Sequence, residues 1–223
     1  MLVPDSAGVM ILGSSVLFPQ AMLPLFIFEP RYRTMLTQAI DSHRMFCIAM
    51  QKPNDSRETP LPVAGLGLIR AAVKNTNGTS NLVLQGITRV RLGKVIRYKP
   101  YRVHEISPLV PEETDSVAID ALRSRLLELV EVRLRQNPPA APELLQQLVK
   151  AGGGGPHPAT AATRGLRHVS NSGYLADLVT LLLIGNPLAR QVILQSIPVA
   201  DRLRHLIHFL QTDVAEQPAD GPA

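Results

Sequence analysis

Short apolar runs, each ended by glycine, proline or asparagine, fill the first half of this chain. Residues 9–18 and Met45–Met50 form two of these runs, and the second is continuously apolar, which is typical of a buried strand. Leu66–Val73 and Asn81–Leu92 flank an Asn-Gly dipeptide at 77–78. Both residues of that dipeptide tolerate positive φ, so the two runs predict a β-hairpin.

The return strand of this hairpin carries leucines on one face and arginines on the other. Leu82 and Leu84 lie on the predicted inner face, whereas Arg89 and Arg91 lie on the outer face. A further β-prone segment runs from Lys94 to Val110. Several short strands with glycines at their bends predict a small, partly closed β-barrel.

The stretch Leu17–Arg33 (LFPQAMLPLFIFEPRYR) is dense in aromatic residues and proline. Pro19 and Pro24 exclude a continuous helix or a central strand, because proline fixes φ and lacks an amide donor. The apolar residues around them therefore predict an extended, buried connection. Glu29-Pro30 predicts the start of a helix, since proline is favoured at the first helical position. The apolar face of this helix holds Tyr32, Met35, Leu36, Ala39 and Ile40, and Glu29 is expected to pair with Arg31 or Arg33.

The apolar period becomes helical from Ser116 onward. One stripe holds Ile119, Leu122, Leu126, Leu129 and Val130, and a short helix is expected at Glu143–Lys150. The glycine-rich run 151–158 predicts a flexible linker. Ser172 is the expected N-cap of the next helix, and two more helices follow Asn186 and Pro198. We therefore predict a strand lobe over 1–110, a helical bundle over 111–213 and a polar tail over 214–223.

The charge distribution, the single cysteine and the apolar runs indicate the cellular compartment of the protein. Residues 1–110 hold 13 Lys and Arg against 6 Asp and Glu, net +7, whereas residues 111–223 hold 10 against 12, net −2. The single cysteine, Cys47, lies in an apolar run and suits a reducing compartment. No basic residue precedes Arg31, and the apolar runs are too short or too broken by proline to cross a bilayer. We expect a cytoplasmic protein with no membrane partner.

Four motifs together resemble the Lon protease N-terminal domain family, also called the Lon substrate-binding domain. Leu17–Arg33 resembles the opening signature of that family. Gly65–Ile69 resembles its "G-x-G/T-x-I" strand, and Leu84–Leu92 resembles its "L-x-G-x-x-R-F-R-I" strand. Tyr101-Arg102-Val103 is similar to the segment that follows. The resemblance covers nearly all of residues 9–211, and Gln20 stands where the family usually has glycine.

The resemblance implies an α+β fold, with a PUA-like β-barrel lobe followed by an α-helical bundle. Full Lon proteases add an ATPase module and a Ser-Lys peptidase module, and the sequence holds neither. No G-x-x-x-x-G-K-[ST] motif occurs, and no serine lies in a recognisable nucleophile turn. We therefore expect a stand-alone, non-catalytic module with no cofactor and no metal site. Asp201, His205 and His208 share one helix face, but two histidines and one carboxylate are more typical of a solvated face than of a metal site.

Two binding hypotheses remain. In the first, apolar side chains at Met22, Leu25 and Phe28 recognise exposed apolar segments of unfolded or partly folded proteins, as an adaptor for proteolysis or quality control, alone or with a protease partner. Its structural alternative is that Phe26, Phe28 and Tyr32 fill the barrel. In the second hypothesis the barrel binds RNA, because PUA-like barrels of other families do so. The basic and aromatic residues for that role are Arg89, Arg91, Arg97, Tyr98, Lys99 and Tyr101. Their alternative role is as outward residues of a half-exposed sheet.

Overall fold

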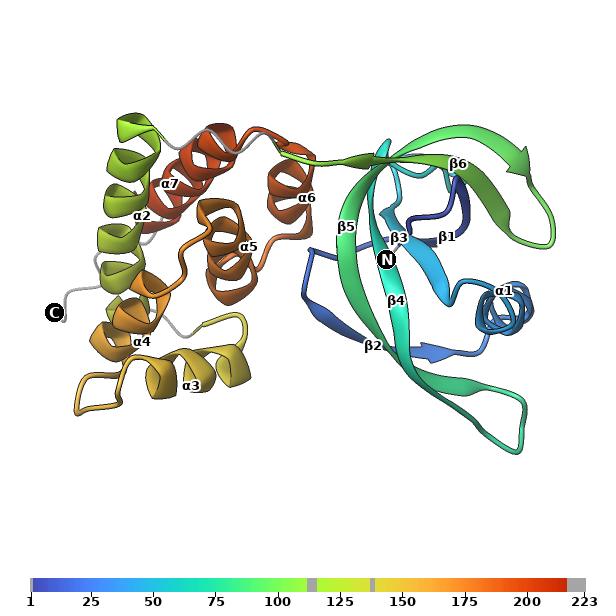
Figure 1. The fold of residues 1–223 in the computed structure, drawn as a ribbon, viewed down its shortest axis with the longest axis horizontal. Helices are drawn as coiled ribbons and strands as arrows, with labels where there is room; N and C mark the ends of the chain where they lie inside the picture. The colour runs from blue at the N-terminus through green and yellow to red at the C-terminus, as the bar shows by residue number, and fades with distance from the viewer. Residues whose placement is uncertain (1, 112–115, 137–138, 216–223) are drawn as a thin grey trace, which may run out of the picture. The chain divides into compact units, whose positions relative to one another are not determined.

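The computed structural model describes residues 2–111, 116–136 and 139–215, and the chain divides into two compact units (Figure 1). Unit 1 is Met1–Val110 and unit 2 is Pro111–Ala223. Within the described residues, unit 1 holds six strands and one helix, and unit 2 holds six helices. The chain is therefore an α+β protein in which the strands and most helices are segregated along the sequence.

Unit 1 is built on one mixed sheet. Its strands, in chain order, are β1 (Ser6–Leu12), β2 (Met22–Ile27), β3 (Met45–Met50), β4 (Val63–Lys74), β5 (Ser80–Arg97) and β6 (Arg102–Leu109). Their order in the sheet is β2-β5-β4-β3-β1-β6, and only the pair β1 and β3 is parallel among the pairings of the described strands. The long strand β5 pairs with β2 and β4 and also with β6. The pairings therefore run from β5 through β4, β3, β1 and β6 back to β5.

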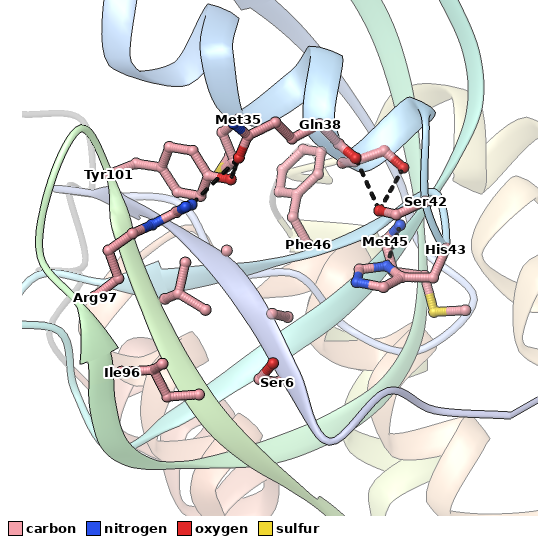
Figure 2. A pocket seen from close by; sticks show the side chains of 14 residues that line it. Ser6, Met35, Gln38, Ser42, His43, Met45, Phe46, Ile96, Arg97 and Tyr101 are labelled. Atoms are coloured by element: carbon pink, nitrogen blue, oxygen red, sulfur yellow. Dashed lines mark hydrogen bonds between the residues drawn. The ribbon is translucent and has the colours of Figure 1, made fainter.

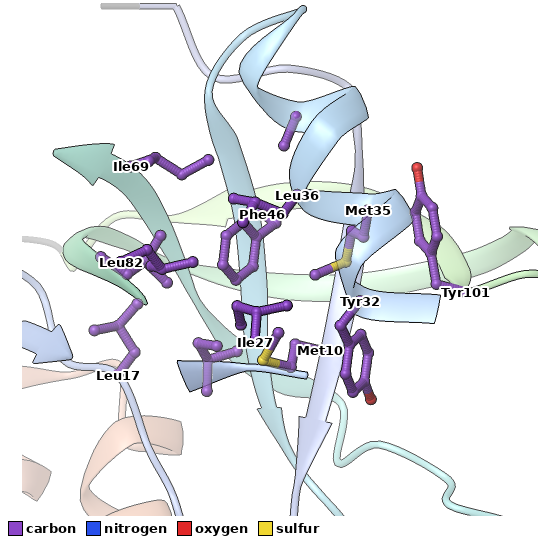
Figure 3. Packing of buried hydrophobic residues seen from close by; sticks show 13 residues of the cluster. Met10, Leu17, Ile27, Tyr32, Met35, Leu36, Phe46, Ile69, Leu82 and Tyr101 are labelled. Atoms are coloured by element: carbon purple, nitrogen blue, oxygen red, sulfur yellow. The ribbon is translucent and has the colours of Figure 1, made fainter. Parts of the chain in front are cut away.

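Two apolar clusters cover the two faces of this sheet, because successive residues of a strand point to opposite sides. Phe46 and Ile48 of β3 join the cluster that packs against the helix of unit 1 (Figure 3). Cys47 and Ala49 of the same strand join the other cluster, with Val9 and other residues. Complete burial raises the pKa of the Cys47 thiol to about 12. This cysteine is therefore a core residue, as its apolar run predicted.

Helix α1 (Pro30–Ile40) begins at the predicted proline and buries four residues of the predicted face, Tyr32, Met35, Leu36 and Ala39, while Ile40 is partly buried. At its start Arg31 Nε donates to Glu29 Oε2 at 2.8 Å, and Arg31 Nη1 donates to Glu58 Oε2 at 2.5 Å. The hydrogen bond with Glu58 raises the pKa of Arg31, and the same bond lowers the pKa of Glu58. The expected Glu29–Arg31 pair thus exists and is extended to the loop between β3 and β4.

Unit 2 holds the helices α2 (Val117–Gln136), α3 (Pro142–Ala151), α4 (Pro158–Arg167), α5 (Ser172–Leu183), α6 (Pro187–Gln195) and α7 (Val199–Ala215). Asn171 is the N-cap of α5, one residue before the predicted cap, and its side chain accepts from the Tyr174 amide at 2.7 Å. The buried side chains of Arg202 and Asp177 pair at 3.5 Å and join α7 to α5. In the described residues no helix has the length and hydropathy that a bilayer span requires.

Helix α4 was not predicted from the sequence. The run from 151 to 158 was expected to be a linker, but a helix follows directly at Pro158 and buries Ala162, Thr163 and Leu166. Small residues permit this packing: a Cβ at Gly152 would lie 1.9 Å from the Ala161 oxygen, and one at Gly165 would lie 2.3 Å from the Leu148 oxygen. The predicted tail falls mostly on residues 216–223, which lie outside the described part of the chain.

Candidate functional site

The segment before β2 is fixed to the sheet by backbone contacts. Leu17 and Phe18 are buried, and two glycines make room for their main chain. A Cβ at Gly65 would lie 2.0 Å from the Leu17 oxygen, and one at Gly86 would lie 1.9 Å from the Phe18 oxygen. The Gln20 amide donates to the Gly86 oxygen at 2.7 Å, and the Gly86 amide donates to the Ala21 oxygen at 2.8 Å. These contacts therefore fix the chain around Pro19 at one position on the sheet, directly before β2 begins.

Strand β2 follows this anchor and pairs antiparallel with β5, from Met22 opposite Gln85 to Ile27 opposite Ser80. Within the described residues β2 has β5 as its one neighbour, so it is an edge strand. Pro24 lies within it, which an edge position permits because only one side of the strand needs amide donors. The expected extended connection is thus a strand of the sheet.

The two faces of β2 differ in exposure. Leu23 and Leu25 pack against the cluster beneath α1, and Ile27 is fully buried there. The alternate residues point outward: Met22 is 56% exposed, Phe26 is 55% exposed, and Phe28, directly after the strand, is 60% exposed. The prediction that this segment is buried is therefore wrong for its outer face.

One more exposed apolar residue, on β4, projects to this same side of the sheet. The register places Phe26 opposite Asn81 of β5 and Asn81 opposite Val73 of β4, and Val73 is 63% exposed. Because residues directly opposite each other project to one side of a sheet, Phe26 and Val73 share a face. The rings of Phe26 and Phe28 stack, with centroids 6.0 Å apart. We call Met22, Phe26, Phe28 and Val73 the β2 surface.

The structure divides the residues predicted for protein binding. Met22 and Phe28 lie on the β2 surface, whereas Leu25 points to the core. Phe26 was expected to fill the interior with Phe28 and Tyr32, but only Tyr32 does so, donating its hydroxyl to the Ile11 oxygen at 3.4 Å. Alternation with a period of two from Met22 would have placed Phe26 outside and Leu25 inside. No local signal marked Val73, which joins the surface only through strand pairing.

The residues predicted for RNA binding do not form one face. Arg89, expected to point outward, is buried, and its guanidinium lies 5.6 Å from the Phe18 ring centroid. Tyr101 is also buried and is covered by Arg97, whose guanidinium lies 4.5 Å from its ring centroid. The remaining members, Arg91, Tyr98 and Lys99, are exposed. Of the two tyrosine rings predicted to stack on bases, Tyr101 is therefore buried and Tyr98 is exposed.

The residues considered for a metal are engaged with their own helix or its neighbour. Asp201 accepts from Arg204 at 2.7 Å, and His205 Nδ1 lies 2.9 Å from the Ser196 hydroxyl. The His208 ring contacts Phe209. Among the described residues there is no group of three or more His, Cys, Asp or Glu placed to hold a metal ion.

A mixed sheet with one packed helix, followed by six further helices, defines an α+β protein whose first unit presents an apolar strand face. The family model described as the ATP-dependent protease La (LON) substrate-binding domain matches residues 7–212. The chain therefore belongs to the Lon substrate-binding domain family, as its motifs indicated.

Curated relatives and solved structures agree with this assignment. The chain is 24% identical over 212 residues to the Lon protease of Desulfosudis oleivorans and 26% identical over 215 residues to that of Phenylobacterium zucineum. Each match covers 93% of this chain and 24% of the relative, so the chain spans about a quarter of the length of these relatives.

Two solved structures share the fold. The N-terminal domain of Mycobacterium avium complex Lon protease has a TM-score of 0.68 at 17% identity, and a Lon N-terminal domain protein from Xanthomonas campestris has 0.63 at 18%. Both comparisons cover 92% of this chain and 98% of the other chain. The α+β architecture of the whole chain is therefore that of Lon N-terminal domains.

Proposed function

We propose that this chain binds exposed apolar segments of non-native proteins through the β2 surface. The observation that carries the proposal is that Met22, Phe26 and Phe28, on or directly after an edge strand, are each more than half exposed and that the two phenylalanine rings stack. Exposed apolar side chains in a contiguous patch are typical of a recognition surface. Membership of a substrate-binding domain family supports a polypeptide as the occupant.

Side-chain contact is the expected source of affinity. Covering the exposed half of each phenylalanine ring contributes about 1 kcal/mol by removal of apolar area from water. Strand addition at the free edge of β2 is a weaker source, because Pro24 has no amide to offer a bound strand. Binding should therefore select apolar side chains with little requirement for one backbone register.

We further infer that unit 1 is a small PUA-like barrel and that the chain acts as an adaptor in proteolysis or quality control. The sequence of pairings that returns to β5 supports the barrel. Membership of a substrate-binding domain family supports the adaptor role, because an adaptor has to bind the proteins that are to be degraded.

The test compares two double variants, each of which replaces two exposed apolar side chains with serine. Phe26→Ser with Phe28→Ser removes the stacked pair, and Leu188→Ser with Val192→Ser removes an exposed apolar pair from α6 as a matched control. The ligand is a labelled model protein that is reduced and carboxymethylated so that it cannot refold. We expect the β2 variant to raise the Kd measured by fluorescence anisotropy at least about fivefold.

The control variant and the folded form of the ligand separate this result from non-specific adhesion. We expect the α6 variant to bind like the parent protein and the folded ligand to bind weakly or not at all. Affinity should change little with salt, whereas nucleic-acid binding would fall steeply as ions compete for phosphates. Equal losses in the two variants would contradict the assignment to β2.

A further inference from the structure

A pocket of about 360 Å³ lies in unit 1 beside α1 (Figure 2), and none of its lining residues belongs to β2. It is lined by the start of β1, one side of α1, the start of β3, the end of β5 and the start of β6. Most of this lining is apolar, including Met35, Ala39, Phe46 and Val103. Its volume falls in the range of roughly 300–1,000 Å³ that is typical of small-ligand sites.

Arg97 is the cation of this pocket, and its own chain holds it in place. Its guanidinium stacks on Tyr101 and donates through Nη2 to Gln38 Oε1 at 3.3 Å. The Tyr101 hydroxyl donates to the same Gln38 oxygen, so α1, β5 and the start of β6 meet at one acceptor. Figure 2 shows Arg97, Tyr101 and Gln38 together along one wall. The side chain is therefore oriented before any ligand arrives.

The charge of Arg97 has no counterion in the described part of the chain. None of the residues that line the pocket is an aspartate or glutamate, and Arg97 forms no ion pair there. Its Nε is buried without a hydrogen-bond partner among the described residues. A half-buried guanidinium favours a planar anion, because a carboxylate accepts two of its N–H groups at once.

We propose that this pocket binds the C-terminal residue of a polypeptide, with Arg97 holding the carboxylate and the apolar lining holding the side chain. The ligand chemistry is a carboxylate on an apolar body, which the last residue of an apolar chain end supplies. The choice of a polypeptide over a free small acid rests on the proposed function. The pocket and the β2 surface share no residue, so they are two separate contacts on one unit.

The first experiment uses the unmodified protein and a short labelled peptide that ends in leucine. The peptide is compared with its C-terminal amide, which has the same apolar body without the charge. We expect amidation to raise the Kd at least about tenfold. Equal binding of the acid and the amide would overturn the proposal, and this comparison needs no variant that could fail to fold.

Variants then place the effect at Arg97. Arg97→Gln should abolish the difference between acid and amide, whereas Arg91→Gln, which removes the same charge from an exposed position of β5, should preserve it. N-acetyl-leucine should compete with the peptide, because it carries the same terminal residue. Binding of N-acetyl-leucine without binding of the peptide would overturn the assignment to polypeptide ends.

The double variant of the β2 surface distinguishes the pocket proposal from the proposal that the β2 surface binds apolar segments. With Phe26→Ser and Phe28→Ser in place, the ratio of acid to amide affinity should stay unchanged. Peptide binding that ignores amidation but is lost in the β2 variant would overturn the pocket and leave the β2 surface standing. The opposite outcome is also possible: the peptide acid still binds more tightly than the amide, but the β2 variant binds the carboxymethylated protein as tightly as the parent does. That result would overturn the β2 surface and leave the pocket.

Discussion

Gln20 adopts a φ of 65°, in the left-handed region that side chains with a Cβ occupy at a cost of about 1–2 kcal/mol. The position lies between the two hydrogen bonds that tie the anchor of β2 to Gly86. The backbone there is fixed by the sheet, so the residue cannot relax. This geometry favours glycine, the residue that the resemblance to the Lon N-terminal domain family led us to expect at this position.

We expect Gln20→Gly to raise the free energy of unfolding of unit 1 by about 0.5–1 kcal/mol, because relief of the strain exceeds the added entropy of the unfolded chain. Urea unfolding followed by tyrosine fluorescence is the measurement, since three of the four tyrosines lie in unit 1 and the chain has no tryptophan. Gln20→Ala keeps the strain and is the control. A loss of stability in the glycine variant would contradict the account.

At the scale of elements, α3 and α4 pack at the distance that Gly152 and Gly165 permit. The Cβ of an alanine at 165 would lie 2.3 Å from the Leu148 oxygen, a backbone atom that cannot rotate away. Alanine otherwise favours a helix over glycine by about 1 kcal/mol. Packing therefore predicts that Gly165→Ala lowers the free energy of unfolding, whereas helix propensity predicts that it raises it.

We expect packing to dominate, so that Gly165→Ala lowers the free energy of unfolding of unit 2 by about 1–3 kcal/mol. Circular dichroism at 222 nm during urea unfolding is suitable, since unit 2 holds six of the seven described helices. Gly185→Ala is the control, because no atom lies within 4 Å of a Cβ there. A more stable Gly165→Ala variant would show that α3 and α4 are looser than described.

Local sequence signals predicted most helices and strands, but they did not predict how those elements pack against one another. The Asn-Gly turn correctly predicted the hairpin of β4 and β5, and Pro30 correctly predicted the start of α1, because these residues restrict φ locally. Helix α4 was missed because its buried residues are mostly alanine, glycine and threonine, which are small and only weakly apolar, and because it directly follows a glycine-rich run. Its stability depends on the fit against α3, which no local pattern records.

At the scale of the whole molecule, Cys47 reports on the folding of unit 1. Its thiol is completely buried, and its pKa of about 12 leaves little of the reactive thiolate at pH 8. We expect a thiol reagent to label the native protein at least about a thousandfold more slowly than the urea-unfolded chain, with a rate that follows opening of unit 1. Comparable rates in the two states would contradict the burial.

The sequence by itself determined the family through its motifs. It also determined most strands of unit 1 and most helices of unit 2, because these depend on local dihedral preferences and on periods of 2 and 3.6 residues. Only the tertiary structure decided that Arg89 is buried, that Val73 joins the β2 surface, and that Arg97 lines a pocket with no counterion among the described residues. The physical reason is that exposure depends on which other segments cover a face. Strand pairing and helix packing bring those segments together from distant parts of the chain.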